Sequence, residues 1–143
     1  MKFMMMAFAA CLFHIMSPQL FAQNLPEPLL TAAQLPMYPP TAPAGIVKAS
    51  FVLNTKGEVI SVEILSVGSY DLRKATEENI WSWKFQMPHD LYRTEWKYET
   101  TFVYHLSGHE VENKQTPKFT VIFESFRHVE VIRDNPRPVV LVD

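Results

Sequence analysis

The residues best suited to metal chemistry lie in one short stretch of the chain. His105 and His109 are four residues apart, and Glu110 and Glu112 follow them. On a helix this spacing would place both imidazoles on one face, where they could bind zinc. Here the stretch ends an alternating strand pattern, in which four residues span about 13 Å and the side chains diverge. We therefore expect a solvated loop and no metal site.

A second candidate is the pair His89 and Asp90, which could act as an oriented acid and base. No nucleophile accompanies the pair, and the side chains of adjacent residues point apart. Ser66 and Ser69 also lack the sequence of a nucleophile elbow. We therefore expect that the protein is not an enzyme, with no catalytic residues and no cofactor.

The composition argues against several other classes of protein. Among 143 residues there are 13 Lys and Arg against 15 Asp and Glu, a net charge of −2. The basic surplus typical of nucleic-acid-binding proteins is therefore missing. Cys11 is the only cysteine, which excludes a disulfide framework and a thiolate zinc site within the chain. The chain contains only 4 glycines, so a phosphate-binding Gly-rich loop is not expected.

Residues 1–22 have the layout of a secretory signal peptide. Lys2 supplies a positive start, and residues 3–16 are almost wholly apolar. Ser17 and Pro18 end the apolar run, and Ala22 offers a small residue for cleavage. We expect cleavage after Ala22 and a periplasmic or secreted protein.

Two other interpretations of this end remain open. An uncleaved membrane anchor would need about 20 apolar residues, and the run here is shorter. Residues 8–11 (Phe-Ala-Ala-Cys) resemble a lipoprotein cleavage box, although Phe8 is unusual at its leading position. Only an uncleaved N-terminus would bring the protein into contact with a membrane.

Residues 23–44 are expected to form an extended, Pro-rich lead-in to the folded domain. Proline fixes its own backbone angle and keeps the preceding residue extended. Six prolines lie in this segment: Pro26, Pro28, Pro36, Pro39, Pro40 and Pro43. The short piece 31–35 is the one place where a helical turn is expected.

Two alternating segments predict a β-hairpin. Residues 47–54 and 59–66 each place apolar side chains on one face, as in half-buried strands. Between them Gly57 suits the positive backbone angle of a tight turn.

The following segment predicts one helix, which begins near Ser69 or Asp71 and ends near Lys84. Its apolar stripe consists of Leu72, Ala75, Ile80 and Trp83. Trp81 lies about 200° around the helix from Trp83. We expect the C-terminal segment to cover Trp81; its exposure at a partner surface is the alternative.

A long third strand is expected over residues 92–106, and a further β-rich segment over 119–132, interrupted near 125–128. The element order is strand, strand, helix, strand, with an appended C-terminal β segment. Because helix and sheet are segregated, the predicted class is α+β: a small antiparallel sheet with one helix packed on it.

The order of these motifs resembles the C-terminal domain of TonB proteins, the periplasmic energy transducers of Gram-negative bacteria. The resemblance rests on Tyr38-Pro39, the hairpin turn 56–59, the helix start at Asp71, and the helix end 83–88 (Trp-Lys-Phe-Gln-Met-Pro). On this basis we assign residues 45–108 to a TonB C-terminal-like domain and 109–143 to a C-terminal β extension and tail.

The resemblance implies a protein-binding function linked to transmembrane transport in the cell envelope. Domains of this family bind an extended segment of an outer-membrane transporter by adding a strand to the edge of their sheet. It implies that the third strand is the receiving edge, with Thr100, Phe102 and Tyr104 as partner-binding residues. Tyr38 and Pro39 would lie in the part of the lead-in that engages the transporter.

Other functions remain open because residues 119–132 lie beyond the family domain. If they pair beside the third strand, they occupy the edge that a transporter segment needs. The protein would then be a secreted structural or accessory domain with a self-closed sheet. Such a domain could also form a homodimer. A minimal anchored energy transducer is a further alternative.

Overall fold

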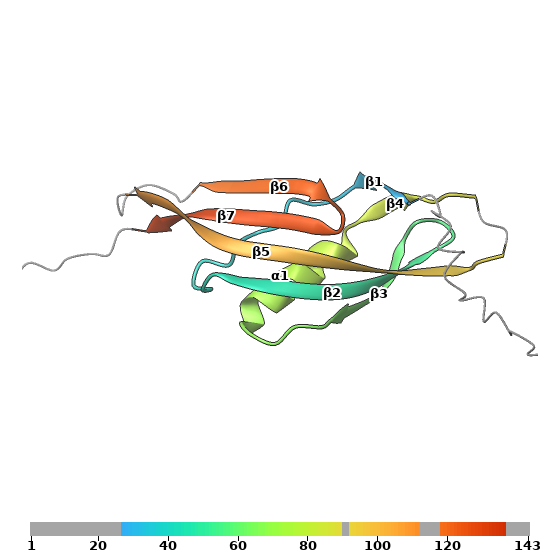
Figure 1. The fold of residues 1–143 in the computed structure, drawn as a ribbon, viewed down its shortest axis with the longest axis horizontal. Helices are drawn as coiled ribbons and strands as arrows, with labels where there is room; N and C mark the ends of the chain where they lie inside the picture. Colours follow the sequence, from blue (N-terminus) through green and yellow to red (C-terminus); the bar gives the residue numbers. More distant parts are fainter. Residues whose placement is uncertain (1–26, 90–91, 112–117, 137–143) are drawn as a thin grey trace, which may run out of the picture.

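The computed structural model describes residues 27–89, 92–111 and 118–136 of the chain, without the side chains of residues 109–111 and 136 (Figure 1). The predicted signal peptide, residues 1–22, therefore lies outside the described residues. The elements in chain order are β1 (Leu29–Ala32), β2 (Gly45–Asn54), β3 (Val59–Ile64), α1 (Tyr70–Trp81), β4 (Lys84–Gln86), β5 (Glu95–Val111), β6 (Phe119–Ser125) and β7 (His128–Pro136).

The strands form one five-stranded sheet, in the order β3-β2-β5-β7-β6, and a two-stranded sheet of β1 and β4. The α+β class is confirmed. The larger sheet is mixed, because β5 and β7 run parallel while its other pairs are antiparallel. Figure 1 shows α1 behind β2 and β5, on one face of this sheet.

The core lies between this face and the elements that cover it: α1, β4 and the lead-in. Alternating residues of β2, β5 and β7 supply the sheet side, as the period-2 patterns predicted. The largest fully buried aromatic side chains are Trp83, Tyr38, Tyr104, Phe51 and Phe102. The C-terminal segment belongs to the same core, since Phe126, Val129 and Val131 are buried within it.

The helix begins as predicted and ends earlier. Ser69 caps its start by accepting a hydrogen bond from the backbone N–H of Leu72 at 3.4 Å. The helix ends at Trp81, whereas Lys84 was predicted, so Trp83 lies beyond it. Four residues form the buried face of the helix: Leu72, Thr76, Asn79 and Ile80.

Two of these buried residues are polar, which explains why the apolar stripe was misread. The Thr76 hydroxyl donates to the carbonyl of Leu72, and the Asn79 side chain accepts from the Trp83 indole N–H at 3.0 Å. Hydrogen-bonded in this way, polar groups are compatible with burial. Ala75 of the predicted stripe is only half-buried.

The lead-in contains a strand where a helical turn was expected, so the prediction for residues 31–35 is wrong. β1 pairs antiparallel with β4, and the Thr31 hydroxyl donates to the carbonyl of Lys84 at 3.0 Å. A four-residue strand depends on its partner for backbone hydrogen bonds, and that partner lies more than fifty residues along the chain. Local sequence therefore could not reveal it.

The hairpin turn holds β4 against the first two strands. Gly57 has φ +76°, as predicted for the turn, and its carbonyl accepts from the N–H of Phe85 at 2.9 Å. A Cβ at this position would lie 1.8 Å from the carbonyl oxygen of Phe85. Both the backbone angle and the close approach therefore require glycine.

We predict that Gly57→Ala lowers the free energy of unfolding by at least about 2 kcal/mol. The added Cβ would force the hairpin turn and β4 apart. Urea denaturation measures the change. Gly108→Ala is the matched control, since Gly108 has no positive φ and no atom within 4 Å of an added Cβ. Equal stability of the two variants would contradict the prediction.

Candidate protein-interaction site

The residues predicted to receive a partner strand lie in an inner strand of the sheet. Thr100, Phe102 and Tyr104 belong to β5, which pairs with β2 on one side. On the other side β7 pairs with β5 over residues 101–106. The prediction of an open edge is therefore wrong for Phe102 and Tyr104, where the chain's own C-terminal segment occupies it; Thr100 lies one residue before this pairing begins. These three side chains are also at most 2% exposed.

Of the two lead-in residues of the prediction, only Tyr38 is packed inside the protein. Tyr38 is 0% exposed, and its ring meets that of Tyr104 edge to face, with 5.4 Å between centroids. Pro39 is half-buried. The structure thus brings Tyr38 beside the predicted strand residues, but as core. Pro39 lines a surface hollow of about 420 Å³, which Asp71, Lys74 and Glu78 of α1 also border.

Arg133 of β7 fixes the lead-in to the sheet, a role that no motif in the sequence predicts. Its guanidinium lies over the Tyr38 ring at 4.5 Å from the centroid. One guanidinium nitrogen donates to the carbonyls of Pro39, at 2.9 Å, and of Pro40. Proline cannot donate a backbone hydrogen bond, but its carbonyl accepts one. In the sequence, the one hint of such acceptors is that Pro39 and Pro40 are adjacent.

Burial shifts the acid–base properties of the two tyrosines in this cluster. Desolvation raises the pKa of Tyr104 to about 12, while its hydrogen bond to Thr76 opposes the shift. Burial also raises the pKa of Tyr38, and the charge of Arg133 partly offsets that change.

The outer edge of the sheet is formed by β6. Within the described ranges no strand pairs with the far side of β6. The N–H of Asp134 donates to the carbonyl of Lys118 at 3.1 Å. Because bonded and non-bonded pairs alternate in an antiparallel ladder, the N–H groups of Phe119, Val121 and Phe123 point away from β7. This row of donors and acceptors is open to an added strand.

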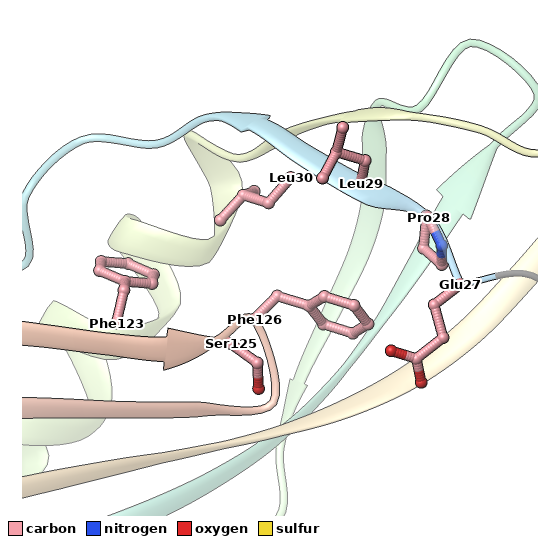
Figure 2. A pocket seen from close by; sticks show the side chains of 7 residues that line it. All are labelled: Glu27, Pro28, Leu29, Leu30, Phe123, Ser125 and Phe126. Carbon is pink, nitrogen blue, oxygen red and sulfur yellow. The ribbon is translucent and has the colours of Figure 1, made fainter.

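A hollow of about 380 Å³ lies between β6 and β1, beside the end of this edge (Figure 2). Figure 2 shows Leu29 and Leu30 of β1 on one side of it and Phe123, Ser125 and Phe126 on the other. Glu27 and Pro28 complete its lining. The lining is therefore mainly apolar.

One wall of the hollow is held by an ion pair between segments far apart in the sequence. The Arg127 guanidinium donates to one carboxylate oxygen of Glu27 at 2.7 and 2.9 Å. It also lies over the Phe126 ring, 5.1 Å from the centroid. The turn between β6 and β7 is thereby tied to the chain before β1.

The opposite edge, β3, borders a different kind of surface. A smaller hollow of about 280 Å³ lies between β3 and α1. Besides Val62, Ile64 and Tyr70, its lining includes Arg73, Lys74 and Glu77. An apolar side chain would meet more charged groups here than beside β6.

The two tryptophans of the helix end differ as expected, but the predicted cover is wrong. Trp83 is 0% exposed and Trp81 is 46% exposed. The C-terminal segment covers the buried one, since Phe123 lies 6.2 Å from the Trp83 ring. Trp81 therefore remains available for contact on the opposite side of the helix end.

Comparisons with family models, with curated proteins and with solved structures gave no significant match. The resemblance to the TonB C-terminal domain therefore remains a prediction. No helix in the described part of the chain is long and apolar enough to cross a membrane.

We predict that Arg133→Met lowers the free energy of unfolding by about 3 kcal/mol, because the lead-in carbonyls lose a buried donor. Arg127→Gln is the control: its ion pair with Glu27 is about half exposed, so the loss stays below about 1 kcal/mol. Urea denaturation compares them. A smaller effect for Arg133→Met than for Arg127→Gln would contradict the proposed anchoring.

The raised pKa of Tyr104 predicts a loss of stability at alkaline pH. An unfolded tyrosine ionises near pH 10, whereas the folded one keeps its proton up to about 12. The stability that the raised pKa of Tyr104 gives the folded state is complete below pH 10 and is lost as the pH rises to 12. Over this interval we expect the free energy of unfolding to fall about 2 kcal/mol more for the wild type than for Tyr104→Phe. Parallel pH curves would contradict this.

Proposed function

We propose that this protein is an exported, non-enzymatic binding module of the TonB C-terminal kind. It binds an extended segment of an envelope protein by strand addition. The expected partner is the segment that an outer-membrane transporter offers on its periplasmic side. The signal-peptide pattern supports export, and the order of motifs supports the family relationship.

The observation that carries this proposal is the outer edge of β6, with which no described strand pairs, next to an apolar hollow. Backbone pairing gives affinity for any extended segment, and a pocket for alternate side chains gives selectivity. Phe119 and Ile122 of β6 are 46% and 42% exposed and would be covered by the partner. The receiving strand is thus β6, in place of the predicted β5.

The segment that fits this site is extended and carries an apolar side chain near one end. Its backbone pairs with the outward N–H groups of β6. Its apolar side chain enters the hollow between Leu30 and Phe123, beyond the point where β6 ends. Burying one such side chain contributes about 1.5 to 3 kcal/mol.

A second function is favoured by the pairing of β7 with β5. A sheet that fills its own inner edge suits a structural or accessory domain without a transport role. In that case β6 of two copies would pair with each other and form a homodimer. A minimal anchored transducer would depend on residues 1–22, which lie outside the described residues.

A photo-crosslinking experiment in the living cell envelope separates these functions. A photoreactive residue replaces either Ile122 of β6 or Ile60 of β3, which are 42% and 43% exposed. The proposal predicts crosslinks from position 122 to an outer-membrane transporter and none from position 60. Transporter crosslinks from position 60 alone would move the site to β3. Crosslinks only to a second copy would favour the structural function.

Hydrogen exchange offers a second measurement, made on the isolated protein in its exported form. We predict slow exchange for the N–H groups of β5 at residues 101–106, because β2 and β7 flank them. The outward N–H groups of β6 exchange quickly and become protected when the crosslinked partner's segment is added as a peptide. Unchanged exchange in β6 on binding would exclude strand addition there.

A further inference from the structure

The sheet face opposite α1 carries a cluster of histidine and glutamate side chains. His105 comes from β5, His128 and Glu130 come from β7, and Glu124 comes from β6. In the sheet register Thr101 pairs with His128 and Val103 with Glu130, so these side chains share one face. Each is partly open to solvent: the side chains of His105, His128 and Glu130 are 42%, 36% and 28% exposed.

One distance in this cluster matches the separation of two ligands of a single metal ion. His128 Nε2 lies 3.5 Å from Glu130 Oε1. Two nitrogen or oxygen ligands of a tetrahedral zinc ion, each about 2.1 Å from the metal, lie roughly 3.4 Å apart. One ligand atom each from Glu124, His128 and Glu130 lies within 4.8 Å of the other two. Glu124 is exposed, so its side chain has room to change rotamer.

We propose that Glu124, His128 and Glu130 bind a divalent transition metal ion, with zinc as the best fit. Imidazole and carboxylate together suit zinc, and three protein ligands leave the fourth position to water. His105 is a positioning residue: its Nε2 lies 3.4 Å from the second oxygen of Glu130 and holds that carboxylate in place.

The site would act on the edge strand that forms the outer border of the sheet. Glu124 lies in β6, and its neighbour Ser125 lines the apolar hollow. A metal ion joining Glu124 to His128 and Glu130 would hold the end of β6 against β7. This inference does not rest on the proposed binding function, because metal affinity is measured without any partner.

The test is zinc titration of the untagged exported chain, by isothermal calorimetry and by the shift in melting temperature. We expect one zinc ion per chain and a rise in Tm for the wild type. His128→Asn and Glu130→Gln each weaken affinity at least tenfold. His105→Gln weakens it several-fold with the stoichiometry unchanged.

His89→Asn is the matched control, because His89 is an exposed histidine outside the cluster. It keeps the wild-type affinity. Melting of each variant without metal establishes that it is folded. Equal zinc affinity for His128→Asn and the wild type, or no zinc binding by the wild type, would overturn the proposal.

Discussion

The parallel pairing of β5 with β7 is the interaction on which the rest of the structure depends. It places Val129 and Val131, both 0% exposed, over the same core as Phe102 and Tyr104. It also places residues 101–104 of β5 between β2 and β7, with backbone partners on both sides. An inner strand buried on one face tolerates the large aromatic side chains of β5, whereas an open edge of this composition would invite association.

The same strand determines where the lead-in lies. Arg133 follows Val131 on the inner face of β7, and its guanidinium reaches the carbonyls of Pro39 and Pro40. A buried guanidinium is costly unless its donors are satisfied. The lead-in carbonyls accept from Nη1 of Arg133, while its Nε is buried and has no hydrogen-bond partner among the described residues. Tyr38 is held between Arg133 and Tyr104 by the same arrangement. The Pro-rich segment is thus part of the core.

The C-terminal strands move the outer edge of the sheet from the predicted β5 to β6. The C-terminal hairpin of β6 and β7 fills the edge that the resemblance implied, and offers its own outer strand in exchange. Strand addition needs only unpaired backbone groups, so the proposed mode of binding would be preserved at β6. The side-chain surroundings change, since the new edge borders Leu30, Phe123 and Phe126. The selected partner segment would change accordingly.

Local pattern alone determined the hairpin of β2 and β3, the Gly57 turn, the Ser69 helix start and the inward face of β5. These features follow from period-2 alternation, from one positive backbone angle and from one capping side chain. The α+β class follows from their order. Tertiary structure alone decided that β1 pairs with β4, that β7 inserts beside β5, and that Arg133 anchors the lead-in. It also assembled Glu124, His128 and Glu130. Each of these features depends on partners distant in the chain or on neighbouring strands. The local hydrophobic periodicity does not indicate which strands will be neighbours.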